Sequence, residues 1–174
     1  MKSLKPVIYL DFDGVLADFE GKAFELFGNA WKTEIDKPGW GMFAEYPNLY
    51  EILEPYPDAM KLYKGCCDII GDKNQVRGLT ALPKRARDNF PNAARDKIDW
   101  AAKHIDPNFR TYFGPLARDK QYHAKHPHDV LIDDMKMNID QWDAAGSFGI
   151  LHSFKSVDDT LHALYEFYME KDLF

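Results

Sequence analysis

The stretch from Val7 to Phe19, VIYLDFDGVLADF, places two aspartates one residue apart directly after a short apolar run. Consecutive apolar residues of this kind are typical of a buried strand. Carboxylates at such a spacing repel each other unless a positive charge lies between them. A divalent cation supplies that charge well, because Asp side chains are hard oxygen ligands. The stretch therefore predicts a strand that ends at a cation site containing Asp11 and Asp13.

Similar apolar runs recur along the chain, and segments with helical periodicity separate most of them. The runs are Val7–Leu10, Val76–Leu79, Phe109–Phe113, Val130–Ile132 and Phe148–Leu151. This alternation predicts an α/β domain with a largely parallel sheet flanked by helices. With 174 residues, of which 45% are hydrophobic, the chain is long enough for one sizeable core.

One of the helical segments is NAARDKIDWAAKHI, residues 92–105. Its apolar residues recur at the spacing of one helix face, which is expected to be buried. The residues of this face are Ala94, Ile98, Ala101 and Ile105.

The interval from Asp13 to Thr80 is 67 residues, more than a simple βαβ crossover needs. Residues 37–57, KPGWGMFAEYPNLYEILEPYP, are dense in Pro, Gly and aromatic residues. We expect residues 20–57 to form a small helical cap, and residues 1–19 and 58–174 to form the catalytic core. Tyr50 is expected to pack within the cap.

Polar residues occupy the predicted strand ends, where open α/β sheets bind ligands. They are Asp11, Asp13, Thr80, Asp133 and Asp134, with Lys120 shortly before the last pair. Such a set indicates a magnesium site facing a phosphate, because carboxylates hold the ion while a hydroxyl and an ammonium meet the phosphoryl oxygens. Asp11 is placed to attack phosphorus, and Asp13 to transfer the proton. Gly14 is expected to let backbone N–H groups approach the phosphate.

Composition excludes several classes of function. The formal charge of −6, from 22 basic and 28 acidic residues, argues against binding along a nucleic-acid backbone. No apolar run approaches the length of about 18 residues that suggests a transmembrane helix, so no membrane partner is expected. The adjacent cysteines Cys66 and Cys67 cannot staple the fold and favour a reducing, cytoplasmic location.

Four motifs, DFDGVLADF, VRGLT, RDK and DVLIDD, resemble in order and spacing the four motifs of the haloacid dehalogenase (HAD) superfamily. Through DFDGVLADFEG, LEPYPDAM and RDK…DVLIDD the chain resembles the 5′(3′)-deoxyribonucleotidases. The likeness runs from about Val7 to a few residues beyond Ile132. It implies a Rossmann-like core, a cap between the first two motifs, and Mg²⁺-dependent hydrolysis of deoxyribonucleoside monophosphates through an aspartyl-phosphate.

The resemblance also implies residue roles. Asp11 is the nucleophile and Asp13 the acid/base. The metal is held by the Asp11 side chain, the Asp13 backbone carbonyl and Asp134, with Asp133 in support. The sequence alone does not decide which of the adjacent pair touches the ion.

Substrate-binding residues follow from the same resemblance and from the aromatic cap. They are Asp13, Phe19, Trp40, Phe43, Thr80, Ala81 and Lys120. Ala81 stands where the family commonly has Ser, so a hydroxyl is missing there. The long spacer between Lys120 and the acidic pair leaves Lys125 as an alternative motif lysine.

Three functions remain open at this stage. The first is the deoxyribonucleotidase, acting on a small nucleoside monophosphate as a monomer or homodimer. The second keeps the chemistry for another small phosphate ester or a polynucleotide 3′-phosphate end. The third is a phosphate-responsive binding protein without turnover. The histidines His123, His126 and His128 are interpreted as a surface loop, because histidine suits magnesium poorly.

Overall fold

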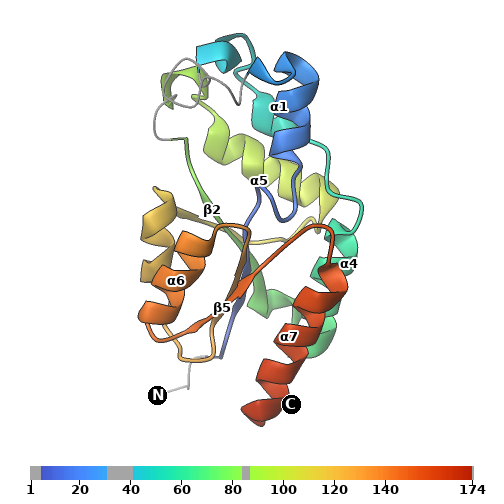
Figure 1. Cartoon of the computed structure of the whole chain (residues 1–174), viewed down its shortest axis with the longest axis vertical. Helices are drawn as coiled ribbons and strands as arrows, with labels where there is room; N and C mark the ends of the chain where they lie inside the picture. The colour runs from blue at the N-terminus through green and yellow to red at the C-terminus, as the bar shows by residue number, and fades with distance from the viewer. Residues whose placement is uncertain (1–4, 31–40, 84–86, 174) are drawn as a thin grey trace.

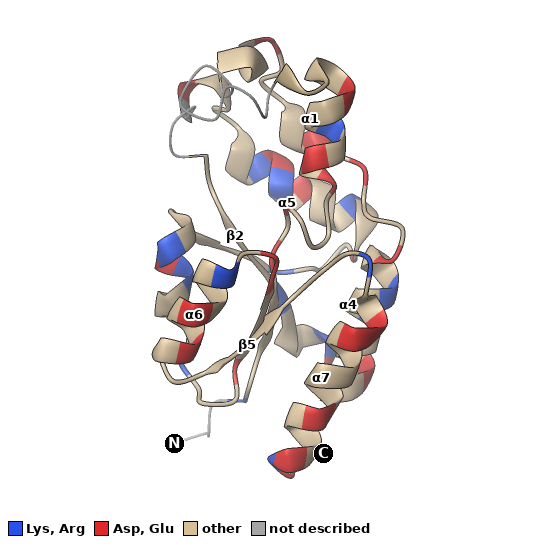
Figure 2. Cartoon of the chain, in the orientation of Figure 1, with Lys and Arg blue, Asp and Glu red and all other residues tan. Residues whose placement is uncertain are grey.

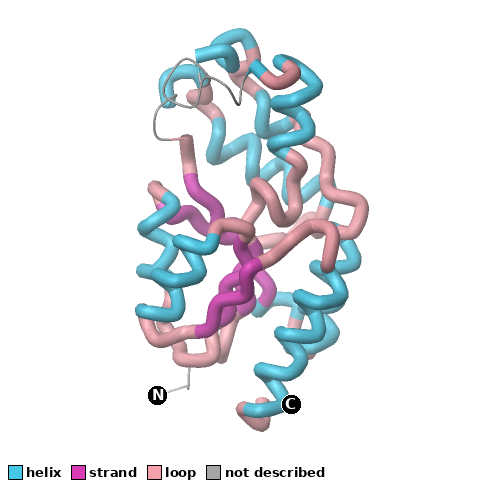
Figure 3. Tube along the Cα trace, viewed as in Figure 1, coloured by secondary structure: helices cyan, strands magenta, loops and turns pink. Residues whose placement is uncertain are grey.

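The computed structural model describes residues 5–30, 41–83 and 87–173. Its centre is a five-stranded sheet of order β3-β2-β1-β4-β5, in which every neighbouring pair is parallel. The strands are β1 (Ile8–Leu10), β2 (Val76–Ala81), β3 (Thr111–Gly114), β4 (Val130–Asp133) and β5 (Phe148–Leu151). The sheet lies inside a shell of helices (Figures 1 and 3). The predicted α/β class with a parallel sheet is confirmed.

Helices cover both faces of the sheet. The cluster on one face includes side chains of α4 (Ala59–Ile70), α5 (Ala93–His104) and α7 (Val157–Glu170), and the cluster on the other includes side chains of α6 (Lys136–Ala144). The short 3₁₀ segments η3 (Lys73–Gln75), η4 (Arg87–Asn89) and η5 (Ala117–His123) lie in connections. Strands covered on both faces are apolar at consecutive positions, which explains the runs in the sequence. Within the described ranges, no helix has the combination of length and apolar character that a bilayer span requires.

Strand order places a crevice beside β1. Ile8 pairs with Val76 of β2 on one side and with Val130 of β4 on the other. The chain moves outward from β1 through β2 to β3 and then returns to the far side of β1 at β4. At such a switch point the flanking connections diverge, so residues just beyond β1 and β4 share one open edge.

The segment between β1 and β2 folds over that edge. It forms α1 (Phe19–Phe27), η1 (Met42–Glu45) and η2 (Leu49–Glu51), which lie at the top of the molecule near α5 (Figure 1). The chain leaving β1 and the chain returning to α4 are hydrogen-bonded to each other. The Asp18 N–H donates to the Glu54 carbonyl at 2.9 Å and the Tyr56 N–H to the Leu16 carbonyl at 2.9 Å.

Helix α5 buries only part of the predicted face, since Ala101 is 0% and Ile105 is 7% exposed. Ile98, expected inside, is 40% exposed. The buried residues are Ala93, Asp96, Lys97, Trp100 and Ala101. The predicted face was right at Ala101 and wrong at Ile98, because the pattern of apolar residues gave no reason to bury a lysine. The buried ammonium of Lys97 is paired with Asp13 and hydrogen-bonded to Thr80 at the edge of the sheet, which offsets the cost of burying it.

Trp100 of α5 is hydrogen-bonded to Leu53, in the segment that leads from η2 to α4. Its ring is 1% exposed, and its Nε1–H donates to the Leu53 carbonyl at 2.7 Å. Trp100→Phe keeps an aromatic ring but leaves that carbonyl unpaired, so the free energy of unfolding should fall by about 1–3 kcal/mol. Urea denaturation measures the change. The control is Trp142→Phe, whose buried indole has a longer bond of 3.4 Å to Asp129; an equal or larger loss there would contradict the assignment.

Candidate active site

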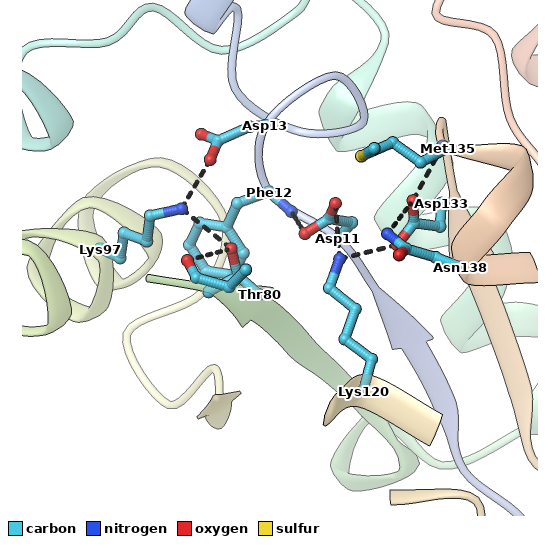
Figure 4. Close-up of polar contacts among 10 residues, drawn as sticks. Asp11, Phe12, Asp13, Thr80, Lys97, Lys120, Asp133, Met135 and Asn138 are labelled. Atoms are coloured by element: carbon cyan, nitrogen blue, oxygen red, sulfur yellow. Dashed lines mark hydrogen bonds and ion pairs between the residues drawn. The ribbon is translucent and has the colours of Figure 1, made fainter. Parts of the chain in front are cut away.

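Asp11 is held at the end of β1 by a buried lysine. The Lys120 Nζ lies 2.7 Å from the Asp11 Oδ2 and 2.7 Å from the Asp133 Oδ2, and the lysine side chain is 2% exposed. Burial lowers the pKa of Lys120, but the two carboxylates outweigh burial and the net shift is upward. Lys120 therefore stays charged and bridges the ends of β1 and β4 (Figure 4).

The alternative lysine lies elsewhere. Lys125 follows η5, and its backbone N–H donates to the Asp129 Oδ2 at 2.9 Å. The long spacer after Lys120 forms the rest of η5 and the turn that leads to β4. The structure thus brings Lys120, rather than Lys125, to Asp11.

Asp133 is fully buried and saturated with donors. Its Oδ1 accepts the Met135 N–H at 2.9 Å, and the Asn138 Nδ2 lies 3.0 Å from both oxygens. The Lys120 ammonium donates to Oδ2. Asp133 therefore joins Lys120, Asn138 and the start of α6, and its supporting role stays a prediction. Asn138, on α6, was missed because one asparagine in a helical segment carries no signal of its own.

Asp134 contrasts with its neighbour. Its carboxylate lies against Gly14, and desolvation together with repulsion from Asp11 and Asp133 raises its pKa to about 7. Lys120 forms ion pairs with Asp11 and Asp133 but not with Asp134. Asp134 is therefore the member of the acidic pair whose carboxylate is not already paired with Lys120, so it remains available to a ligand.

Asp11, Asp133 and Asp134 together can hold a metal ion, since one oxygen of each lies within 4.8 Å of the others. With Asp13, this edge carries four carboxylates against the two ammonium groups of Lys97 and Lys120. An all-oxygen donor set with excess negative charge suits a hard divalent cation. The residues present thus fit a bound divalent metal ion.

A second buried lysine joins Asp13 to Thr80. The Lys97 Nζ lies 2.7 Å from the Asp13 Oδ2 and 2.9 Å from the Thr80 Oγ1, with its side chain 2% exposed (Figure 4). Thr80 lies near the end of β2, and Lys97 reaches it from α5. Lys97 was missed because a lysine within a helical segment carries no signal of its own.

The loop after Asp11 is compact. The N–H groups of Val15, Leu16 and Ala17 all donate to the Phe12 carbonyl, at 3.2, 2.8 and 2.8 Å. Gly14 has φ of +85°, and its N–H donates to the Ala17 carbonyl at 3.1 Å. The loop therefore uses the N–H of Gly14 internally, and the approach of other backbone N–H groups of this turn to a phosphate stays a prediction.

A cavity of about 380 Å³ opens beside Asp13. It is lined by Asp13, Tyr50, Ala81, Leu82, Pro83, Leu116, Ala117, Arg118 and Met137. Phe19 and Phe43, predicted to contact the substrate, are buried and do not line this cavity. Their ring centroids lie 5.6 Å apart, and Phe19 packs against Tyr50, which does line it. Trp40 lies outside the described residues. Tyr50 packs in the core as predicted and also lines the cavity.

The histidines of the spacer make ordinary structural contacts. The ring of His123 packs against Tyr9 and Tyr112, and the His126 Nδ1 accepts the His128 N–H at 3.0 Å. Burial lowers the pKa of His123.

The parallel sheet has aspartates after β1, a threonine at the end of β2, a lysine before β4 and an acidic pair at its end, which is the arrangement expected of a HAD-type phosphatase. The family model described as 5′ nucleotidase, deoxy (pyrimidine), cytosolic type C protein matches residues 5–164. The chain belongs to this family and is a nucleotidase-type HAD phosphatase.

Two solved structures are similar to the chain. The HAD domain of the effector protein Lem4 from Legionella pneumophila is 16% identical, with 86% of this chain and 85% of that chain covered and a TM-score of 0.43. A HAD hydrolase of family IA, variant 3, from Entamoeba histolytica is 13% identical, with coverage of 91% and 100% and a TM-score of 0.45. No curated protein sequence matches the chain.

Gly14→Ala should disrupt the metal site. A Cβ at this position would overlap the Asp134 carboxylate, in addition to the strain of φ +85°. Displacing that carboxylate should weaken divalent-cation affinity by about 10- to 100-fold, as measured by titration calorimetry. Gly146→Ala is the matched control, because its φ is +91° and its Cβ would meet open space. The same loss of affinity in both variants would assign the effect to backbone strain alone.

Proposed function

We propose that the protein is a magnesium-dependent phosphomonoesterase that hydrolyses deoxyribonucleoside monophosphates through an aspartyl-phosphate on Asp11. The observation that carries the proposal is the placement of the Asp11 carboxylate within the acidic triad, paired with Lys120 and next but one to Asp13. Asp13 is 35% exposed at its side chain and lines the cavity, so it can reach a bound ester. A nucleophile and a proton-transfer group thus meet at one open edge.

The reaction proceeds in two displacements. The Asp11 carboxylate attacks phosphorus, and the bond between phosphorus and the ester oxygen breaks. Asp13 donates a proton to that leaving oxygen and so releases the nucleoside. Asp13 then takes a proton from a water molecule that attacks the phosphorus of the acyl phosphate. Inorganic phosphate leaves, and the Asp11 carboxylate is restored.

Positive charge around the phosphoryl group lowers the barrier to both steps. Lys97 and Thr80 lie beside Asp13, where they can donate to phosphoryl oxygens, and Lys120 neutralises the Asp11 side of the site. Mg²⁺, when bound, supplies further positive charge for the phosphoryl oxygens. Asp11, Asp134 and the Asp13 backbone carbonyl are the proposed ligands, because Asp133 is committed to Lys120, Asn138 and the Met135 N–H.

The cavity supports a small substrate. Its volume of about 380 Å³ lies in the usual range for small-molecule sites, about 300–1,000 Å³. Most of its lining is apolar, which suits a nucleobase and a deoxyribose. Helix α7 carries mainly acidic charges (Figure 2), and the net charge is −6, so a long nucleic acid is disfavoured. We propose residues 20–57 as the cap that recognises the nucleoside.

A screen for phosphate release over all nucleoside 5′- and 3′-monophosphates, with and without Mg²⁺, tests the proposal. Preferred release from another small ester would move the activity to that substrate while leaving the chemistry in place.

The free thiols of Cys66 and Cys67 fit the proposed cytoplasmic location, which is a reducing compartment.

Asp11→Asn should lower turnover by a factor on the order of 10⁴ or more, because an amide cannot form the acyl phosphate. The folded structure should persist, since an amide has nearly the same shape. Phosphate release and thermal denaturation are measured on the same preparation. Turnover near the wild-type rate, in protein freed of host phosphatases, would rule out Asp11 as the nucleophile.

Metal affinity should rise with pH through about 7. Asp134 has a raised pKa of about 7 and must lose its proton before it can bind a cation. Below that pH the proton competes with the metal, so Mg²⁺ affinity at pH 6 should be about tenfold weaker than at pH 8. Calorimetric titration with Mg²⁺ measures both values. Equal affinities at the two pH values would contradict a raised pKa at a metal-binding Asp134.

Deoxyribonucleotides should be preferred over ribonucleotides. A ribose 2′-hydroxyl buried against an apolar wall without a partner costs about 1–3 kcal/mol, or about 5- to 150-fold in kcat/KM. Phe19→Ala should narrow this preference by loosening the wall that Phe19 supports. The measurement is kcat/KM for dUMP and UMP with wild type and variant. Equal wild-type values would reject the deoxyribose preference and leave the phosphatase chemistry standing.

A further inference from the structure

The ammonium of Lys97 touches both sides of the reaction centre. Asp13, the proposed acid/base, lies at 2.7 Å and Thr80, beside the proposed phosphate site, at 2.9 Å. A lysine side chain has four rotatable bonds and fixes no geometry by itself. Something else must therefore keep this ammonium between the two oxygens when substrate enters.

Tyr50 lies on the third side of that ammonium. The Lys97 Nζ is 4.5 Å from the centroid of the Tyr50 ring and 5.7 Å from that of Phe12. Tyr50 belongs to η2, within the segment inserted between β1 and β2, and is 3% exposed. Its ring packs against Phe19 and Phe90, with centroid distances of 6.2 and 5.4 Å. The ring is thus fixed by its own neighbours before it meets Lys97.

An aromatic face attracts a cation, and more strongly where water is excluded. Lys97 is 2% exposed, so the contact is desolvated. We infer that Tyr50 is a positioning residue, whose ring holds the Lys97 ammonium between Asp13 and Thr80 so that the inserted segment completes the active site. This inference rests on the proposed function for the roles of Asp13 and Thr80, but the contact between Tyr50 and Lys97 does not.

The ring, rather than the hydroxyl, is the part that acts. Burial raises the pKa of Tyr50 well above its ordinary value, and the nearby Asp13 raises it further. The phenol therefore stays neutral and does not exchange protons with the site at neutral pH. Phenylalanine at position 50 should serve as well as tyrosine.

A double-mutant cycle tests the inference. The variants are Tyr50→Leu, Lys97→Met and the pair, each measured by kcat/KM for the nucleotide that the wild type hydrolyses best. Tyr50→Leu should lower kcat/KM by about 2- to 30-fold in the wild-type background. It should have almost no further effect once Lys97→Met is present, because there is no cation left to hold. The Tyr50→Phe variant, which keeps the ring, should have the wild-type kcat/KM. Equal losses in both backgrounds would show that Tyr50 contributes packing only and would overturn the inference.

Folding is controlled separately. Tyr63→Leu makes the same change at a buried tyrosine of α4, which packs against Phe109 and donates to Asp106. It should lower the melting temperature while leaving kcat/KM within about twofold of wild type. A loss there as large as that of Tyr50→Leu would attribute both effects to reduced stability.

A series of fluorinated phenylalanines at position 50 keeps the shape of the ring and withdraws charge from its face. The affinity for inorganic phosphate, measured by calorimetry, should fall stepwise with each added fluorine. A flat series contradicts the inference even if Tyr50→Leu does not fold. This readout needs no turnover, so it separates failure of the inference from failure of the proposed function, which would appear as wild-type protein that hydrolyses no phosphomonoester.

Discussion

Several carboxylates lie close together at the edge of the sheet where β1 and β4 end, and their mutual repulsion must be offset by positive charge. Asp11 and Asp133 share the buried ammonium of Lys120, at 2.7 Å from each. Buried charges are costly unless they are paired and hydrogen-bonded, and each of these is. Desolvation and the repulsion of Asp11 and Asp133 raise the pKa of Asp134, which forms no ion pair with Lys120. The uncompensated charge at this edge suits a cation, which is the basis of the proposed metal and phosphate sites.

Different layers of the molecule supply the groups that control this charge. The sheet brings Asp11 and the acidic pair together, because β1 and β4 are neighbours in space although 119 or more positions separate them in sequence. Helices α5 and α6 contribute Lys97 and Asn138, which orient Asp13 and Asp133. The inserted segment contributes the Tyr50 ring. A change in any layer is therefore expected to reach the reaction centre through these contacts.

The sequence predicted the sheet and the residues at its strand ends, because apolar runs and polar strand ends are local patterns. Asp11, Thr80 and Lys120 lie where the motifs placed them. Lys97, Asn138 and the second role of Tyr50 were missed, because each side chain comes from a helical segment. Which side chains of such a segment turn inward is decided by tertiary packing, as the exposed Ile98 and the buried Lys97 of α5 show. The resemblance implied Asp134 rather than Asp133 as the metal ligand, and the structure adds a physical reason for that proposal, since Asp133 is already saturated with donors.

The central claim is that Asp11 carries the phosphoryl group during turnover. It is tested most directly by quenching the enzyme in acid during hydrolysis of radiolabelled dUMP and mapping the label after digestion. The account predicts label on the peptide that contains Asp11, formed only when Mg²⁺ is present and released by hydroxylamine, as an acyl phosphate requires. Steady turnover without covalent label, or label on a peptide that lacks Asp11, would contradict it.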